Sequence, residues 1–119
     1  ELLGKTPNLS YGYLHGLISD AAGRGTSVDM PKGFADDYHT YAIDWLPDQI
    51  DWYLDGVFYG SQQKLDKDWV FDHEFYLIMN LAMGGNFGGG IEAGLTQASM
   101  SFDWIRFSTI NGVGEVIKH

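Results

Sequence analysis

The pair Asp55-Gly56 stands between two short runs rich in aromatic and branched residues, 49–54 and 57–60. A two-residue connection of this kind closes a type I′ turn, which needs positive φ at both central residues. Asp-Gly meets that need better than most residue pairs. The pair therefore predicts a β-hairpin, and it constrains the fold more than any other local feature because it commits both flanks to antiparallel strands.

Most of the remaining chain alternates apolar and polar residues with a period of two, which is typical of half-buried strands. Residues 75–83 instead form a nearly continuous apolar run, which suits a central strand covered on both faces. We expect strands at 9–16, 38–45, 75–83 and 99–108, besides the hairpin. We expect polar or glycine-rich loops at 20–33 and 84–90, and a loop or one short helical turn at 61–69; the tail 109–119 is ambiguous.

Strands with short turns and no helical periodicity predict an all-β sandwich or jelly roll. About six strands are few for a closed sandwich with a ligand cleft, and open strand edges would favour association. We expect a core that contains these aromatic residues: Trp45, Trp52, Phe75, Phe102 and Trp104.

Composition excludes several classes of function. The formal charge of -9 disfavours nucleic acids and anionic membrane surfaces, whereas a neutral ligand such as a sugar meets no such repulsion. The chain has no cysteine, which excludes disulfides and thiolate metal sites. No apolar run approaches the length of about 20 residues needed for a membrane span. Because the sequence opens with Glu1 rather than methionine, we expect a processing site, a boundary or a break in a longer chain there.

Five segments, taken in order, resemble one known family. They are 1–16, 38–45 (YHTYAIDW), 50–56 (IDWYLDG), 75–87 (FYLIMNLAMGGNF) and 100–107 (MSFDWIRF). The pattern is similar to that of glycoside hydrolase family 16, in its laminarinase-like group of endo-β-1,3-glucanases. The resemblance implies a concanavalin-like β-jelly-roll sandwich, present here in part. Residues 1–108 would be the carboxyl-terminal half of that domain and 109–119 a tail. It also implies a secreted, extracellular enzyme that acts on β-glucan.

The family's catalytic strand reads Glu-x-Asp-x-x-Glu, in which the first Glu is the nucleophile, the Asp assists and the last Glu is the general acid/base. By this resemblance Glu1 corresponds to the acid/base, and the other two residues would lie before it. Retaining hydrolysis needs two carboxyl groups about 5 Å apart. We therefore expect this chain alone to be inactive on β-glucan. Without the resemblance, Glu1 is a frayed terminal residue.

The resemblance also marks substrate-binding candidates. His15 shares a strand face with Tyr13 and would lie near the cleaved bond; otherwise it is a structural histidine. Phe87 lies in a glycine-rich loop, where the family usually has Trp, and is a candidate for stacking on sugar. Asn80 interrupts an apolar strand, so its amide either bonds a neighbouring loop or points toward sugar hydroxyls. Asn86 has the same alternatives, with a turn role favoured.

Asp103 lies on the last expected strand, at a place where the resembling enzymes often bind one structural calcium ion. Calcium takes six to eight oxygen ligands, of which Asp103 supplies at most two. The alternative is an exposed carboxylate on a strand face.

Three functions stay open for the chain as a whole. It is part of an active enzyme whose complementary amino-terminal half is supplied elsewhere, a non-catalytic β-glucan-binding module, or a fragment that pairs with itself.

Overall fold

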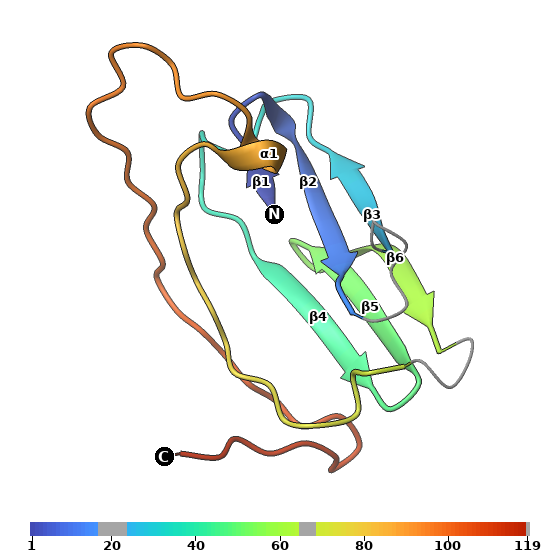
Figure 1. Cartoon of the computed structure of the whole chain (residues 1–119). Helices are drawn as coiled ribbons and strands as arrows, with labels where there is room; N and C mark the ends of the chain where they lie inside the picture. Colours follow the sequence, from blue (N-terminus) through green and yellow to red (C-terminus); the bar gives the residue numbers. More distant parts are fainter. Residues whose placement is uncertain (17–23, 65–68, 119) are drawn as a thin grey trace.

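In a computed structural model the described residues are 1–16, 24–64 and 69–118. They form two three-stranded antiparallel sheets, ordered β1-β2-β3 and β4-β5-β6 (Figure 1). The elements are β1 (Leu2–Leu3), β2 (Thr6–Leu14), β3 (Arg24–Asp29), β4 (Tyr41–Leu46), β5 (Gln49–Leu54), β6 (Val57–Gln63) and the single helical turn α1 (Gly85–Gly88). From residue 75 to residue 118 the chain runs as a trace that is extended except at α1, and we call this segment the arm. The two sheets form the body.

The predicted hairpin is confirmed. Strands β5 and β6 pair from Leu54↔Val57 onward, and the two residues between them have positive φ, 50° at Asp55 and 77° at Gly56. The β5–β6 register shifts by one residue between Trp52 and Tyr53. The turn therefore has the backbone that the Asp-Gly pair predicts.

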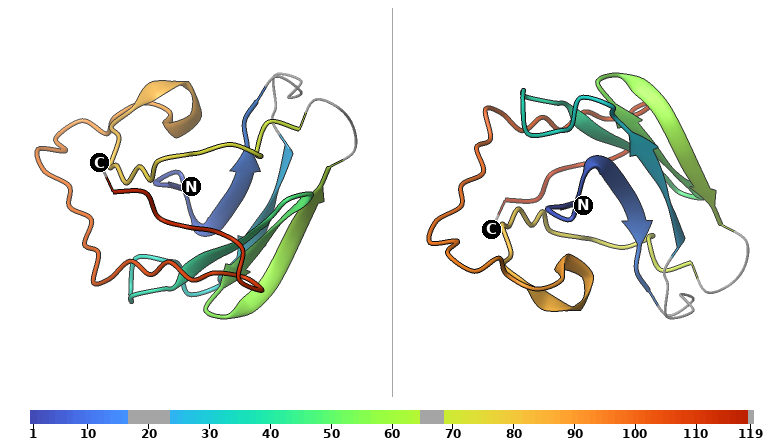
Figure 2. Two further views of the ribbon diagram at one scale, coloured as in Figure 1. Left: turned by 90° about the horizontal axis from the view of Figure 1, so that it is seen from below. Right: turned by 90° about the horizontal axis from the view of Figure 1, so that it is seen from above.

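The two sheets pack face to face, with β2 over β5 and β3 over β6. A Cβ added at Gly12 of β2 would lie 2.6 Å from the Trp52 ring of β5, so only glycine leaves room for that indole. Likewise, a Cβ at Gly60 of β6 would collide with Thr26 of β3. The core between the sheets consists of Ile50, Trp52 and Trp69, with Leu14, Tyr59 and Phe71 packed against it. Figure 2 shows the two layers from both ends.

Two strand predictions are wrong. Residues 75–83 and 99–108 are extended, but they join neither sheet among the described residues, and their side chains are exposed. Of the residues predicted for the core, only Trp52 is buried, at 6% exposed. The others are half-exposed: Trp45 42%, Phe75 52%, Phe102 53% and Trp104 57%. A strand needs a partner for its backbone groups and a cover for its apolar face, and the described residues offer the arm neither.

The remaining predictions need smaller corrections. The expected loop 20–33 contains β3, because Gly25 and its polar neighbours pair with the outer edge of β2. The expected loop 61–69 begins inside β6, which ends at Gln63. The parts of these two predictions at 20–23 and 65–68 lie outside the described residues. Strand 9–16 begins earlier, at Thr6, and strand 38–45 begins later, at Tyr41. The tail has one bridge, between Ile110 and Val113.

Candidate functional site

A row of rings runs along the outer face of β2. Strand residues alternate between faces, and Ser10 and Gly12 point into the sandwich, so Tyr11, Tyr13 and His15 share the opposite face. The Tyr11 and Tyr13 rings stack with centroids 6.0 Å apart, and the His15 ring lies 6.2 Å beyond Tyr13. The two tyrosines are half-buried and His15 is exposed. The alternation noted in the sequence thus brings the three rings into one continuous row.

Phe87 extends this row at its other end. Its ring meets Tyr11 edge-on, with centroids 5.8 Å apart, and the Lys5 Nζ lies 5.8 Å from the centroid of the same ring. Phe87 belongs to α1. That turn begins at Gly85 and is flanked by Gly84 and Gly89, and all three glycines have positive φ. The glycine-rich loop therefore turns sharply enough to bring a residue of the arm back onto the body.

Glu1 lies directly opposite Tyr11 in the β1–β2 ladder. The Tyr11 N–H donates to the Glu1 carbonyl oxygen at 2.8 Å, and the Glu1 amino group donates to the Tyr11 carbonyl oxygen at 2.6 Å. Residues that exchange both backbone hydrogen bonds are a direct cross-strand pair, and their side chains point to the same face. The carboxyl group of Glu1 therefore lies on the face of the ring row, where it is exposed to solvent.

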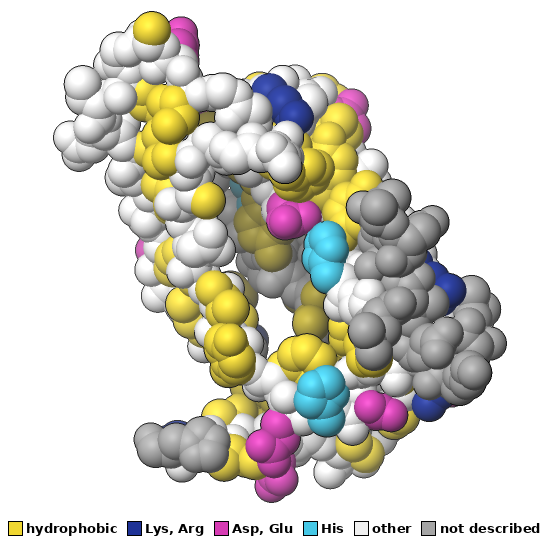
Figure 3. Space-filling model, viewed as in Figure 1, with side chains coloured by type: hydrophobic (Ala, Val, Ile, Leu, Met, Phe, Trp, Pro, Cys, Tyr) yellow, Lys and Arg dark blue, Asp and Glu magenta, His cyan; other side chains and the backbone are white. Residues whose placement is uncertain are grey.

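The surface of this face is hollowed. Figure 3 shows a deep recess between the body and the arm, with hydrophobic side chains at its floor. One acidic and one histidine side chain lie next to each other on its rim. A concave surface that combines rings, a carboxyl group and an imidazole suits a neutral ligand with hydroxyl groups.

The other predicted residues lie apart from this row. Asn80 is exposed on the arm, and Asn86 is exposed in α1, beside Phe87 in the sequence. Asp103 is also exposed on the arm. Within the described ranges no three His, Cys, Asp or Glu side chains gather closely enough to hold a metal ion by themselves. The roles of these three residues stay predictions.

Sequence reasoning missed Lys5 as a neighbour of the row. Its contact with Phe87 joins two segments that are distant in the chain, and no local pattern signals such a contact.

It also missed a polar clasp at the hairpin turn. The Asp55 carboxylate accepts the Thr40 N–H at 2.8 Å and lies 2.8 Å from His39 Nδ1. These two hydrogen bonds lower the pKa of Asp55. The clasp fixes the segment that leads into β4 beside the hairpin turn.

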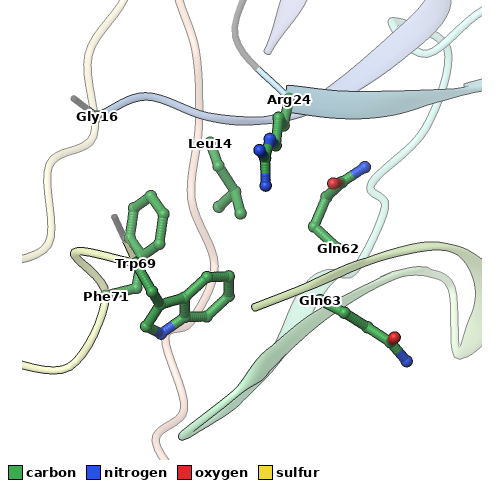
Figure 4. A pocket seen from close by; sticks show the side chains of 7 residues that line it. All are labelled: Leu14, Gly16, Arg24, Gln62, Gln63, Trp69 and Phe71. Carbon is green, nitrogen blue, oxygen red and sulfur yellow. The ribbon is translucent and has the colours of Figure 1, made fainter. Parts of the chain in front are cut away.

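A separate small pocket opens between the sheets at the end of β2 (Figure 4). Leu14, Arg24, Trp69 and Phe71 are among its lining residues, and its volume is about 20 Å³. The indole N–H of Trp69 is buried with no hydrogen-bond partner among the described residues. The space suits one water molecule and is far too small for a sugar ring. The ring row on β2 therefore remains the candidate site.

None of the described helical segments has the length and apolar character to cross a membrane.

A two-layer antiparallel sandwich with a carboxyl group and a row of rings on one open face is the architecture of a carbohydrate-active β-sandwich protein. Residues 1–106 match the model of glycosyl hydrolases family 16, and the chain belongs to that family.

Its relatives include glucan endo-1,3-beta-glucosidase A1 of Niallia circulans, 36% identical over 89% of this chain and 18% of the relative. The glucan endo-1,3-beta-glucosidase of Cryptopygus antarcticus is 38% identical over 76% of this chain and 38% of the relative.

Among solved structures, the endo-beta-1,3-glucanase of Pyrococcus furiosus superimposes with a TM-score of 0.72 at 37% identity. That match covers 78% of this chain and 39% of the other chain. The chain therefore has part of the family's jelly-roll sandwich, and it spans about two fifths or less of these relatives.

Proposed function

We propose that this chain carries the general acid/base and part of the sugar-binding surface of a retaining endo-β-1,3-glucanase that acts on laminarin-type glucan. In this proposal the nucleophile is supplied by residues outside the chain. The observation that carries the proposal is the position of Glu1, paired directly with Tyr11 on the face of the ring row. Two relatives named as endo-1,3-beta-glucosidases support the choice of linkage.

The chemistry requires two carboxyl groups on opposite sides of the scissile bond. In the first step a carboxylate nucleophile attacks the anomeric carbon while Glu1 gives its proton to the departing glycosidic oxygen. In the second step the Glu1 carboxylate takes a proton from water, the water oxygen bonds to the anomeric carbon, and the nucleophile leaves. Glu1 must hold its proton at the start, and a negatively charged nucleophile nearby raises the pKa of a carboxyl group in the required direction.

The register of β2 supports a position for the proposed nucleophile. A strand that continued β1 regularly would set the residues two and four positions before Glu1 opposite Tyr13 and His15. In the family pattern Glu-x-Asp-x-x-Glu, the Asp and the first Glu stand three and five positions before the last. Because both spacings are odd, regular alternation would turn these two side chains to the other face of the sheet, away from the face of Glu1. The proposal therefore requires a one-residue bulge between them and Glu1. With that bulge the first Glu lies opposite His15, whose imidazole can then hydrogen-bond it.

The test joins this chain to the amino-terminal part of the Cryptopygus antarcticus relative, in place of the segment that it matches. We expect the chimera to release reducing sugar from laminarin and this chain alone to release none. Glu1→Gln in the chimera should lower kcat/KM by about 10²- to 10⁴-fold, which is the usual contribution of general acid/base catalysis. The matched control is Glu92→Gln, which removes an exposed carboxylate from the arm.

Either of two results contradicts the proposal. Full activity in the Glu1→Gln chimera would remove the acid/base role. Hydrolysis by the 119-residue chain alone would show that it needs no nucleophile from outside.

A non-catalytic β-glucan-binding module is the second candidate. The ring row favours it, because aromatic side chains can bind sugar without a second carboxylate, and four rings lie in series here: Phe87, Tyr11, Tyr13 and His15. One relative, over 46% of this chain at 35% identity, is a beta-1,3-glucan-binding protein of Penaeus monodon. A chimera whose migration laminarin retards in an affinity gel, but which releases no sugar, would favour this candidate. Because laminarin-type glucans are large polysaccharides, both candidates accord with secretion.

A further inference from the structure

We infer that the outer face of the β4-β5-β6 sheet binds one calcium ion, between the carboxylates of Asp44 and Asp51 and beside the hydroxyl group of Ser61. This face is turned away from the first sheet, which carries the ring row (Figure 2). The inference therefore goes beyond the proposed function and does not depend on it. It assigns a binding role to a patch of side chains that the proposed reaction does not use.

The strand register brings three oxygen-bearing side chains together on this face. Trp52 lies in the core, and neighbours along a strand point to opposite faces, so the Asp51 side chain points outward. Asp51 pairs directly with Asp44 of β4 on one side and with Ser61 of β6 on the other. Direct cross-strand partners share a face, with Cβ atoms about 4.5–5.5 Å apart. The three side chains therefore form a row across the sheet, with Asp51 at its centre.

Two like charges lie side by side in this row. Carboxylates directly opposite each other on neighbouring strands repel, and no lysine or arginine among the described residues forms an ion pair with either one. Asp51 is 9% exposed, and a buried carboxylate is costly unless a positive charge balances it. The pKa of Tyr53 is raised by desolvation, by its hydrogen bond to Asp44 and by the charges of both aspartates. The patch is therefore a place where a cation would be stabilising.

The Ser61 hydroxyl group is an independent observation that points to a ligand. Its oxygen is buried and has no hydrogen-bond partner among the described residues. Buried polar atoms of side chains nearly always have a partner. Because Ser61 is the direct partner of Asp51, its hydroxyl group faces the same space as that carboxylate. A hard cation bound there would satisfy the hydroxyl oxygen and balance the two charges together.

The Gln49 amide shows where a positive group fits. Its Nε2 lies 2.7 Å and 2.8 Å from the two carboxylate oxygens of Asp51, so it bridges them. Calcium binds carboxylates in the same two-oxygen manner, at about 2.3–2.6 Å. The ion would take nearly this place once the amide turns aside. The other hydrogen bond of Gln49, from the exposed Gln63, is long at 3.4 Å and offers little resistance to that movement.

Calcium fits this set of donors better than other common cations. All the donors are oxygen atoms, whereas most transition metals favour imidazole or thiolate ligands. Calcium accepts about six to eight oxygens in a flexible geometry, and magnesium demands a nearly ideal octahedron. Two carboxylates and one hydroxyl group leave several positions for water. With two charged ligands we expect a Kd of about 10⁻⁴ to 10⁻³ M, the range of extracellular calcium modules.

The first experiment measures urea unfolding of the 119-residue chain in calcium chloride, with magnesium chloride as the control for screening. At about ten times its Kd, calcium should raise the folded-to-unfolded ratio about tenfold, because the folded state alone has the site. Asp51→Asn should abolish this rise. Asp36→Asn removes an exposed carboxylate outside the patch and should retain it. An equal effect of both salts, or no effect of calcium up to about 10 mM, overturns the inference.

Asp44→Asn gives a second test, because its effect on stability should change sign with calcium. In a calcium chelator the substitution removes the repulsion and should raise the folded-to-unfolded ratio about two- to fivefold. In saturating calcium it removes a charged ligand and should lower that ratio below the native value, at least about threefold. An acidic pair that binds no ion would give stabilisation under both conditions, and that result overturns the inference.

Calorimetric titration with calcium chloride locates the ion. We expect one ion per chain, with the Kd raised at least about tenfold by Asp44→Asn and about two- to threefold by Ser61→Ala, which removes a neutral ligand. Asp103→Asn should leave the Kd unchanged. Loss of binding in Asp103→Asn together with native affinity in Asp44→Asn would assign the ion to the arm and overturn the inference.

Discussion

The body and the arm have similar sequence patterns and different structures. In the body, β5 is paired on both edges and its residues Ile50, Trp52 and Leu54 are buried. The arm segment 75–83 is more apolar than β5, yet every large side chain in it is close to half exposed or more. The difference teaches that an apolar pattern makes a segment able to form a strand. Whether it forms a hydrogen-bonded ladder depends on the presence of neighbouring strands.

The largest expected effect is on the free energy of unfolding, and it is seen by comparing the substitution of one tryptophan in the body with that of one in the arm. Trp52→Ala should lower the free energy of unfolding by about 3–5 kcal/mol, because it empties the centre of the core under Gly12. Trp104→Ala should change it by less than about 1 kcal/mol, since that residue is 57% exposed and its ring meets the exposed Arg106 guanidinium 5.3 Å from its centroid.

Urea unfolding followed by far-UV circular dichroism measures both variants without relying on tryptophan fluorescence. Equal losses in the two variants would show that the arm packs into the stable core, contrary to the structure.

The contrast between body and arm also explains what the sequence could predict. The hairpin was predictable because Asp55-Gly56 determines its own backbone through local sterics. The ring row was predictable in part, since Tyr11, Tyr13 and His15 follow the period of one strand. Phe87 and Lys5 meet only because the glycine loop folds back, and no local rule gives that contact. Strand β3 was missed because Gly25 and the polar residues after it carry no alternation, and its pairing comes from β2.

The arm shows the opposite error. Residues 75–83 have the composition of a central strand, and the prediction assumed that partners would be present. The family resemblance gave the position of Glu1, but its pairing with Tyr11 became known only from the hydrogen bonds of the ladder. Local chemistry therefore predicted turns and faces, and non-local pairing decided the rest.

A smaller effect tests the polar clasp of the body. The folded-state pKa of Asp55 is lowered from its ordinary value of 3.8, first by the Thr40 N–H and then by His39. A carboxyl group with a lowered folded pKa stabilises the fold above its unfolded pKa, and this stabilisation is lost as pH falls through the folded pKa. Because the Asp55 side chain is 45% exposed, solvent screening limits the contribution to about 0.5 kcal/mol.

Asp55→Asn isolates this contribution, since Asn-Gly forms the same type I′ turn. The difference in unfolding free energy between the native chain and the variant should be constant between about pH 5 and 6 and should shrink below about pH 4. A difference that grows on acidification would contradict the assignment of the stabilisation to the ionised carboxylate.

The smallest expected change in stability comes from a substitution in the arm, which should instead change the association of the chain with itself. Ile105→Lys adds a charge at a side chain that is 60% exposed, so the free energy of unfolding should change by less than about 0.5 kcal/mol.

The arm carries most of the exposed large hydrophobic side chains, and monomeric proteins seldom expose so much apolar surface. We therefore expect the native chain to associate as its concentration rises in sedimentation velocity, and Ile105→Lys to associate less. Val57→Lys is the matched control, because Val57 is 68% exposed on the body. If both variants reduce association equally, the apolar surface that causes it is not specific to the arm, and the contrast between the two regions would fail.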